Sequence, residues 1–233
     1  MSLTQWVTSP DSKHSPSSAF RRKRIALLLH LIEKIHRRYG FVTILDVGGR
    51  RNYWNCVNLD FLTRHQVTIT IANLPGDLEI RSREEEIFRY VEGDGCDLSM
   101  FADDSFQIAH SNSVLEHVGG WENMTRFARE IRRLAPNFYV QTPNFWFPIE
   151  PHVMKPFFHF LPRTAQAHLV RRFNLGHFIQ AISFGDAMRK VEGINLIDRK
   201  LFQELFPDAT ILTEKLCLMT KSLVAFRASE AGE

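Results

Sequence analysis

Residues 42–50 read VTILDVGGR, a short apolar run that ends in Asp46 and a Gly48-Gly49 turn. This pattern is typical of a buried parallel strand, because helices cover the faces of such a sheet. Residues 101–118 read FADDSFQIAHSNSVLEHV, in which an acidic turn is followed by an apolar strand, a polar cluster and a helix start. Two strands that each run into a polar loop predict an α/β sheet whose carboxyl ends carry a ligand site.

The rest of the chain continues the alternation of strands and helices. We expect helices before Gly40, over residues 122–134 and after Asp198, and strands at residues 42–47, 67–72, 89–91, 106–110 and 138–141. Residues 209–218 and 222–226 are close in sequence and predict a hairpin. The predicted fold class is α/β: a doubly wound, mostly parallel seven-stranded sheet, with helices on both faces and a C-terminal antiparallel hairpin.

Two segments fall outside this alternation. Residues 1–20 are rich in serine and predict a flexible N-terminal tail, followed by a single domain over residues 21–233. At about residues 146–195 the alternation stops and aromatics, prolines and histidines accumulate. We expect a helical and aromatic cap to be inserted there, over the site.

Composition narrows the class of protein. A formal net charge of +3 is too small to predict nucleic-acid binding. The three cysteines form no CxxC pair, which argues against a disulfide framework or a zinc site. With no apolar leader or spanning segment in the sequence, we expect a cytoplasmic protein. The basic run Arg21–Arg24 is either a solvated helix face or a phosphate-binding patch, and the helix that carries it could contact an anionic membrane surface or a partner.

These landmarks, in this order, resemble the class I, Rossmann-like S-adenosylmethionine-dependent methyltransferases. The resemblance is strongest to bacterial O-methyltransferases of glycan or small-molecule biosynthesis, through GGRxNYW at 48–54, TPN at 142–144 and PIEPH at 148–152. It implies S-adenosylmethionine as cofactor and a sugar or other small-molecule hydroxyl as acceptor. Fold similarity alone does not establish function.

The resemblance assigns a first group of residues to the cofactor. Asp46, Gly48 and Gly49 match the loop that passes under it, although Arg50 replaces the next glycine of the family. Asn73 stands where relatives present an acid to the ribose. It is either a ribose ligand or simply a turn residue.

A second group of cofactor residues follows the next strands. Asp94 takes the place of the Asp that binds the adenine amino group in relatives, and Gly95 and Cys96 line the same slot. A turn rich in Gly and Asp is the alternative. Asn112 and Ser113 match the small polar residues beside the methyl donor.

The catalytic candidates are His117, His152 and Glu150. Glu116-His117 matches the Glu-His-Val ending of ubiquinone-type and small-RNA methyltransferases, and His117 is either a base or a helix-start residue. His152 is a second candidate base that Glu150 could orient, unless both belong to a rigid surface loop.

A metal site is not predicted, because Ser113 stands where some of these relatives have a further Glu that helps hold a metal. The histidines at 159, 168 and 177 are more typical of structural roles.

Two other classes of protein compete with the enzyme. Arg50 and Asn73, in place of a Gly and an acid, keep open a non-catalytic cofactor-binding or scaffold protein on the same fold. A nicotinamide-dinucleotide enzyme is disfavoured, because residues 48–53 lack the Gly-x-Gly-x-x-Gly spacing.

Overall fold

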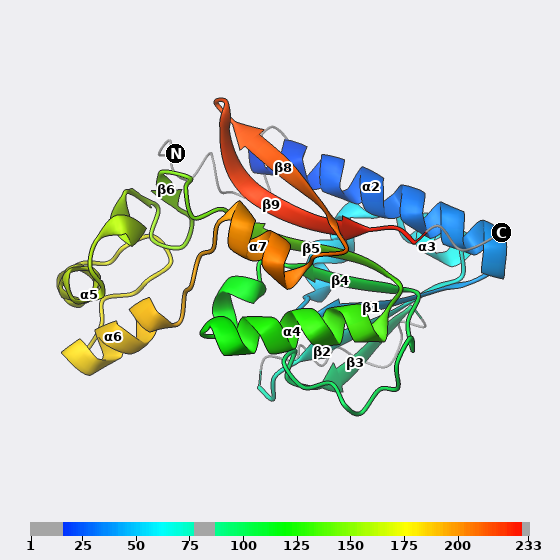
Figure 1. The fold of residues 1–233 in the computed structure, drawn as a ribbon, viewed down its shortest axis with the longest axis horizontal. Coiled ribbons are helices and arrows are strands. Elements are labelled where there is room, and N and C mark those ends of the chain that lie inside the picture. The colour runs from blue at the N-terminus through cyan, green and yellow to red at the C-terminus, as the bar shows by residue number, and fades with distance from the viewer. Residues whose placement is uncertain (1–15, 77–86, 230–233) are drawn as a thin grey trace. The chain divides into compact units, whose positions relative to one another are not determined.

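The computed structural model describes residues 16–76 and 87–229 and contains one seven-stranded sheet of order β3-β2-β1-β4-β5-β9-β8 (Figure 1). Its strands are β1 (Val42–Val47), β2 (Val67–Asn73), β3 (Phe88–Glu92), β4 (Ile108–Asn112), β5 (Asn137–Pro143), β8 (Thr210–Leu216) and β9 (Met219–Arg227). The sheet is mostly parallel and ends in the antiparallel β8–β9 pair. The predicted fold class is confirmed.

The helices are α2 (Pro16–Tyr39), α3 (Leu59–Arg64), α4 (Trp121–Leu134), α5 (Arg163–Arg172), α6 (Phe184–Glu192) and α7 (Arg199–Leu205). Short 3-10 helices are η1 (Arg51–Cys56), η2 (Leu115–His117) and η3 (Phe158–Phe160), and β6 (Ile149–Glu150) pairs with β7 (Lys155–Pro156). Residues 1–15 of the predicted tail lie outside the described residues, and α2 begins at Pro16. As predicted, Asp198 caps α7, by accepting from the Leu201 amide. None of the helices at 16–76 and 87–229 combines the length and apolarity that a membrane span requires.

The chain divides into two compact units. The first comprises residues 1–112, 129–140 and 226–233, and the second comprises residues 113–128 and 141–225. Each unit is described separately below.

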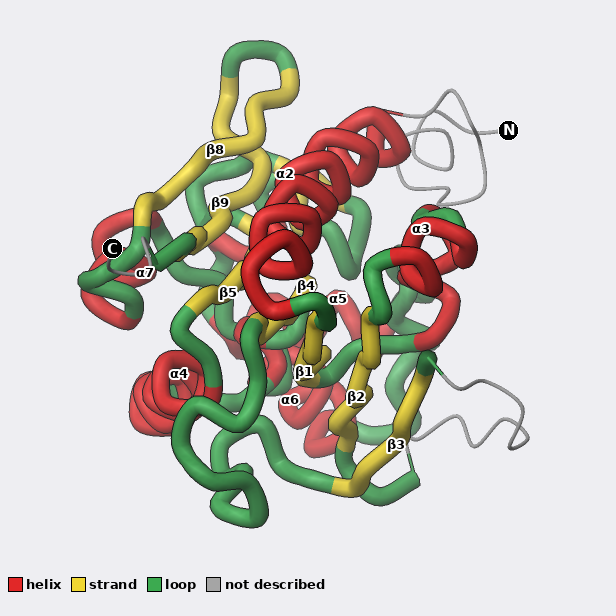
Figure 2. Tube along the Cα trace, turned by 90° about the vertical axis from the view of Figure 1, so that its right-hand side faces the viewer, coloured by secondary structure: helices red, strands yellow, loops and turns green. Residues whose placement is uncertain are grey.

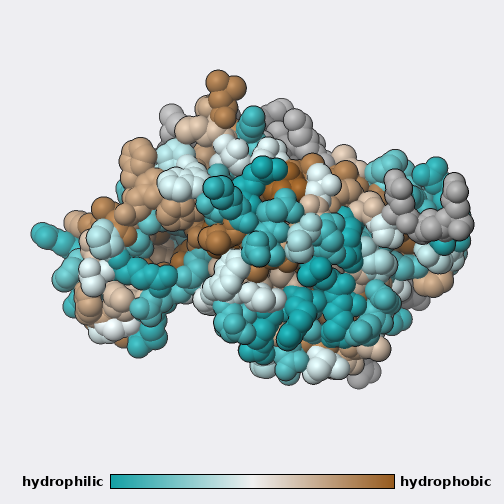
Figure 3. All heavy atoms as spheres, in the orientation of Figure 1, coloured by the Kyte–Doolittle hydropathy of each residue, from teal (hydrophilic) through white to brown (hydrophobic). Residues whose placement is uncertain are grey.

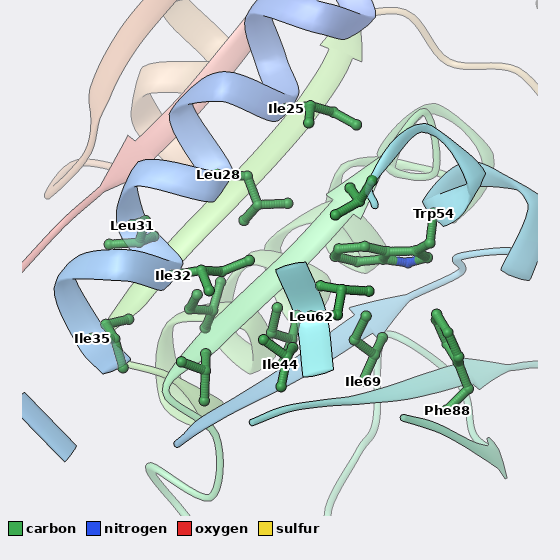
Figure 4. Close-up of a cluster of buried hydrophobic side chains, with 14 of the residues drawn as sticks. Ile25, Leu28, Leu31, Ile32, Ile35, Ile44, Trp54, Leu62, Ile69 and Phe88 are labelled. Carbon is green, nitrogen blue, oxygen red and sulfur yellow. The ribbon is translucent and has the colours of Figure 1, made fainter. Parts of the chain in front are cut away.

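The first unit has its core between α2, α3 and the strands β1 and β2 (Figure 4). Ile25, Leu28 and Ile32 project from one face of α2, as their spacing predicts, and are buried. They pack in one cluster with Ile44 of β1 and Ile69 of β2, which are also buried. Each such side chain contributes about 1.5–3 kcal/mol by leaving water. This core fixes the strands whose ends carry the first candidate site.

Strands β3, β2 and β1 lie side by side and run parallel (Figure 2). In the register of β1, Ile44 faces Ile69 of β2 and Ile108 of β4. The carboxyl ends of these strands therefore meet at one edge of the sheet.

Strand β4 lies two residues later than the predicted range of 106–110, because it continues through the polar residues 110–112. Buried polar side chains are tolerated in a strand when they are hydrogen-bonded. The hydroxyl of Ser111 donates to the Val47 carbonyl (3.0 Å), and the ring of His110 bonds to the Asp46 carboxylate. The change from apolar to polar residues in the sequence therefore does not give the end of β4.

The second unit has a smaller core in its helical part. Val153, Ala167, Val170 and Val191 are buried together, between α5, α6 and the loop before them. The unit also contains the β8–β9 turn, where Cys217 and Leu218 have φ values of 49° and 67°. Leu218 is 94% exposed, and Figure 3 shows hydrophobic atoms where Figure 1 places this turn.

Candidate functional site

In the first unit, the turn after β1 is built around the buried carboxylate of Asp46. Its Oδ2 accepts a hydrogen bond from the indole Nε1 of Trp54 (2.7 Å), and its Oδ1 lies 2.7 Å from Nδ1 of His110. The carboxylate also fills the space beside Gly49, where an added Cβ would lie 1.9 Å from Oδ2. Asp46 is fully buried and both its oxygens are hydrogen-bonded, so its carboxylate stabilises the turn.

The Asp46 carboxylate continues into a chain of hydrogen bonds. Because a carboxylate only accepts, Nδ1 of His110 carries a proton and donates it to Oδ1 of Asp46. The hydroxyl of Tyr53 lies within hydrogen-bond distance, 3.2 Å, of Nε2 of the same ring. Asp46, His110 and Tyr53 thus form a relay of hydrogen bonds in which Asp46 and His110 are buried and Tyr53 is half-buried.

Backbone and amide bonds join the loops at the ends of β1, β2 and β3. The amide of Gly48 donates to the Ala72 carbonyl (2.8 Å), and Nδ2 of Asn73 donates to the Gly49 carbonyl (2.7 Å). The amide of Gly93 in turn donates to the Asn73 carbonyl (2.8 Å). The structure therefore brings Gly48, Gly49, Asn73 and Gly93 together at one edge, as predicted for parallel strands.

The loop after β3 presents Asp94, which is exposed. Its Oδ1 accepts from the Cys96 amide (2.8 Å) and so shapes a tight turn in which Cys96 is buried and Gly95 half-buried. The turn is anchored at its far end, where the Leu98 amide donates to Oε2 of Glu130 (2.9 Å). The Asp94 carboxylate is thus held at a fixed place and remains accessible.

Asn112 and Ser113 fall in different units, although they are neighbours in the chain. Asn112 is half-buried at the end of β4. Ser113 adopts a left-handed conformation (φ 56°), and its hydroxyl donates to Oε1 of Gln141 (2.9 Å). A left-handed residue directly after a strand turns the chain sharply.

In the second unit, the three predicted catalytic side chains meet. Oε1 of Glu150 lies 2.7 Å from Nδ1 of His152, and Nε2 of His152 lies 3.1 Å from Nε2 of His117. Nδ1 of His117 lies 3.3 Å from the carbonyl oxygen of Gly193. Glu150, His152 and His117 form a continuous line, from a buried carboxylate to an exposed imidazole.

The backbone around His152 holds this line in place. The Val153 amide donates to Oε2 of Glu150 (2.5 Å), and the His177 amide donates to the His152 carbonyl (2.7 Å). Gly176 has a φ of 57°, and a Cβ on it would lie 2.5 Å from the His152 carbonyl oxygen. Only glycine fits this close approach.

Glu116 lies beside the line and is fully buried. The hydroxyl of Thr142 donates to its Oε2 (3.1 Å), whereas its Oε1 is buried without a hydrogen-bond partner. Burial raises the pKa of Glu116 to about 7, against the opposing effects of its hydrogen bonds and of His152. A buried, half-satisfied carboxylate is costly to keep, which marks this position as a candidate for function.

The two imidazoles have pKa values shifted in opposite directions. Burial, and then the neighbouring His152, lower the pKa of His117. Burial alone would lower the pKa of His152, but its hydrogen bond with Glu150 and the charges of Glu150 and Glu116 outweigh burial and raise it. A proton on this pair therefore resides preferentially on His152.

Glu150 also forms part of the wall of a cavity of about 360 Å³ within the second unit. Aromatic side chains of Phe145, Phe158 and Phe178 line it together with Arg163. Another of its lining residues is His159, whose Nε2 lies 2.8 Å from the Phe145 carbonyl oxygen and whose Nδ1 is buried without a partner.

Sequence reasoning missed three residues of these clusters. Glu116 stands in the quoted Glu-His motif but was set aside as a ligand, because the motif lacks its first Glu. Trp54 and His110 were missed as partners of Asp46, since their bonds to it depend on the η1 turn and on the register of β4. Trp54 lies within the quoted GGRxNYW stretch, and His110 and Glu116 lie within the quoted residues 101–118, but neither stretch indicated these contacts.

Residues 55–137 match the model of a methyltransferase domain family. This match covers less than half of the chain and contains β2 to β4, α4 and the start of β5. No curated protein matches the sequence.

Several solved structures are similar to this chain at low sequence identity. The YcgJ protein from Bacillus subtilis is 14% identical and has a TM-score of 0.51, with 83% of this chain and 71% of that chain covered. An O-methyltransferase family protein from Burkholderia thailandensis is 13% identical (TM-score 0.49), with 91% and 60% covered. The carbon methyltransferase CurJ is 12% identical (TM-score 0.47), with 81% and 49% covered.

The chain therefore spans about half to three fifths of the length of these last two chains. Residues 55–137 thus match a methyltransferase domain family, and the sheet to which they belong is mostly parallel, seven-stranded and Rossmann-like.

Proposed function

We propose that this protein transfers a methyl group from S-adenosylmethionine to a hydroxyl of a sugar or another small molecule. The observation that carries the proposal is the line of Glu150, His152 and His117 in the second unit. When bound, S-adenosylmethionine supplies an electrophilic methyl group on a sulfonium. The acceptor oxygen has to lose a proton in the same reaction, and the imidazole pair is suited to take it.

The pair is a good proton acceptor for a geometric reason. Each ring uses its Nδ1 to donate, His152 to a carboxylate and His117 to a carbonyl, so both Nε2 atoms are acceptors. One proton added between them makes a hydrogen bond at the observed 3.1 Å. The Glu150 carboxylate stabilises the positive charge that results.

We assign the cofactor to the joined loops of the first unit. The accessible Asp94 carboxylate suits the adenine amino group, and the half-buried Asn73 has its amide oxygen left for a ribose hydroxyl, because its Nδ2 is bonded to Gly49. Gly48 and Gly49 allow a ligand to approach the backbone. Asp46 is fully buried with both its oxygens bonded, and it supports this loop from within the protein.

The cavity beside Glu150 supports a small-molecule acceptor. Its volume of about 360 Å³ lies in the range of small-ligand pockets, about 300–1,000 Å³. Because Nε2 of His159 donates to a carbonyl, its partnerless Nδ1 is an acceptor, which a hydroxyl group of the ligand can satisfy. Aromatic walls with one such polar atom suit a hydroxylated ring.

The cofactor is tested first, by calorimetric titration with S-adenosylmethionine and its demethylated product. We expect both to bind, and the variant Asp94→Ala to bind about tenfold or more weakly, because it loses a charged hydrogen-bond acceptor. Asp97→Ala, in the same loop, is the matched control and should bind like the wild type. If the folded wild-type protein binds neither compound, the proposal fails.

The base is tested by transfer of a labelled methyl group to a panel of sugars and small hydroxylated molecules. His152→Ala should lower turnover by about 10²–10⁴-fold and leave cofactor affinity unchanged. His168→Ala, an exposed histidine of α5, is the control. Equal turnover in both variants would remove the histidine pair from the reaction.

One observation favours a second candidate, a scaffold protein on the same fold. The turn after β1 is closed from within by Asp46, Trp54 and His110, so it is stable without any ligand. This candidate predicts no binding in the titration and no shift in thermal stability with S-adenosylmethionine.

A further inference from the structure

Three exposed aromatic side chains of the second unit, Trp146, Phe157 and Phe160, form a cluster that we call the aromatic surface. Their exposed fractions are 65%, 60% and 41%. The centroid of the Phe160 ring lies 6.1 Å from that of Trp146 and 6.2 Å from that of Phe157, so the three rings are contiguous. Figure 3 shows hydrophobic atoms where Figure 1 places β6, whose partner β7 directly precedes Phe157. A contiguous exposed apolar surface is often a binding site.

The backbone holds Phe157 at the end of the β6–β7 pair. Its amide donates to the Pro148 carbonyl (2.7 Å), and its φ of 60° is left-handed, a conformation that bulky residues rarely adopt. Glycine or asparagine suits such a position better. A phenylalanine that is both exposed and unfavourable in backbone conformation does not favour the fold, which indicates that its ring serves in binding.

Basic side chains lie next to the aromatic surface. Lys155 is exposed and belongs to β7, the strand that ends just before Phe157. Arg199 and Lys200 are also exposed, and together with Trp146 they line an open groove. Three positive charges therefore accompany the three aromatic rings.

Among the described residues that line this groove, Asp198 is the one acid. Its Oδ2 accepts from the indole Nε1 of Trp146 (3.4 Å), and its Oδ1 accepts from the Leu201 amide (3.0 Å). These bonds commit the carboxylate to the local structure. One acid against three bases leaves the surroundings of the aromatic surface positive.

We propose that the aromatic surface binds the interface of an anionic lipid bilayer. Such an interface offers an apolar region to the rings and, directly above it, negatively charged headgroups to Lys155, Arg199 and Lys200. The long stems of lysine and arginine allow their charged ends to reach the headgroups. Tryptophan is enriched at this depth, because its ring is apolar and its indole N–H is polar.

The aromatic surface adjoins the cavity of about 360 Å³. Phe145 lines that cavity, and its ring centroid lies 5.0 Å from that of Trp146 and 5.3 Å from that of Phe160. A bound bilayer would therefore lie beside the cavity, which favours an acceptor hydroxyl carried on an amphiphile. This consequence rests on the proposed function, whereas binding of the bilayer does not.

The test is sedimentation of the full chain with vesicles, in the absence of methyl donor and acceptor. One set of vesicles is phosphatidylcholine alone, and the other is equal parts phosphatidylcholine and phosphatidylglycerol. We expect the wild type to bind the anionic vesicles, and to bind the neutral ones at least about tenfold more weakly.

The variant Phe157→Asn removes one ring and suits the left-handed backbone, so it should remain folded. We expect it to bind the anionic vesicles about tenfold or more weakly than the wild type, because it loses the transfer of a phenyl ring out of water. Phe41→Asn is the matched control, since Phe41 is an exposed phenylalanine (49%) of the first unit. It should bind like the wild type.

Lys155→Gln tests the charge separately. It should weaken binding to the anionic vesicles by about fivefold and leave binding to the neutral ones unchanged. Circular dichroism shows whether each variant is folded. Absence of vesicle binding by the folded wild type would overturn the inference, and so would equal binding by the wild type and Phe157→Asn.

Two further outcomes separate this inference from its alternatives. A wild-type dimer that forms without lipid and that Phe157→Asn dissociates, seen by sedimentation velocity, would assign the aromatic surface to a second copy of the chain and overturn the inference. Vesicle binding that Phe157→Asn weakens, in a protein that transfers no methyl group, would support the inference and contradict the proposed function.

Discussion

At the scale of single residues, Trp54 shows how a buried carboxylate fixes a loop. Its indole N–H is one of the two donors to Asp46, which is fully buried. Phenylalanine in its place would keep most of the apolar contact and leave Oδ2 of Asp46 without a donor. We expect Trp54→Phe to reduce the free energy of unfolding by about 1.5–3 kcal/mol, the range for hydrogen bonds to charged groups.

Urea unfolding followed by circular dichroism measures this loss. Tyr53→Phe is the matched control, because it removes a longer bond (3.2 Å) between Tyr53 and His110 in the same relay. We expect it to cost about 0.5–1.5 kcal/mol. Equal losses of unfolding free energy in the two variants would contradict the claim that the hydrogen bond to the Asp46 carboxylate is the stronger of the two.

At the scale of elements, the β8–β9 hairpin has an unfavourable turn. A two-residue turn with positive φ at both positions strongly prefers Asn-Gly, because other side chains are strained there. Here Cys217 and Leu218 occupy it, with φ of 49° and 67°. We expect the double variant Cys217→Asn/Leu218→Gly to raise the free energy of unfolding by about 1–2 kcal/mol.

The thermal midpoint and a urea titration both report this gain. Leu218→Ala is the control, since it removes the exposed leucine side chain but keeps a Cβ at positive φ. It should leave stability nearly unchanged. A stabilisation by Leu218→Ala as large as that of the double variant would show that exposure of the leucine, and not backbone strain, limits this hairpin.

At the scale of the whole molecule, stability should depend on pH through Glu130. This carboxylate accepts from the Arg133 guanidinium (2.7 Å) and from the Leu98 amide (2.9 Å), and the Arg133 hydrogen bond holds its pKa below the usual 4.5. A group with a lowered folded-state pKa stabilises the protein above its unfolded value. That stabilisation disappears as the pH falls through the folded value.

We therefore expect Glu130→Gln to reduce the free energy of unfolding by about 1.5–3 kcal/mol at pH 7. The difference from the wild type should shrink below about pH 4. Urea unfolding across pH 3–8 checks this, with the exposed Glu92→Gln as control. A difference between Glu130→Gln and the wild type that does not change with pH would refute the assignment.

The sequence predicted the sheet well because periodicity reports burial. The strand Val42–Val47 was predicted to the residue, since its burial and its glycine turn coincide. The boundaries of β4 and of the β8–β9 turn were missed. In the first case buried bonds satisfy polar residues, and in the second the turn lacks the residues that mark one.

The candidate site was predictable only where it rests on a motif. The pairing of Glu150 with His152 follows from two positions between prolines, and the structure joins them. The meeting of His117 with His152 spans 35 residues and depends on how the second unit folds. The internal bonding of Asp46 depends on tertiary structure in the same way.

The contact between Asp46 and Gly49 has a consequence for how this sequence can evolve. A Cβ at position 49 would collide with the carboxylate of Asp46, three residues earlier. The residue at position 46 therefore restricts which residue position 49 can accept. In a randomised library selected only for folding, glycine at 49 should persist for as long as aspartate remains at 46. Retention of this glycine among descendants would then record an inner packing constraint, even in lineages that have lost every ligand.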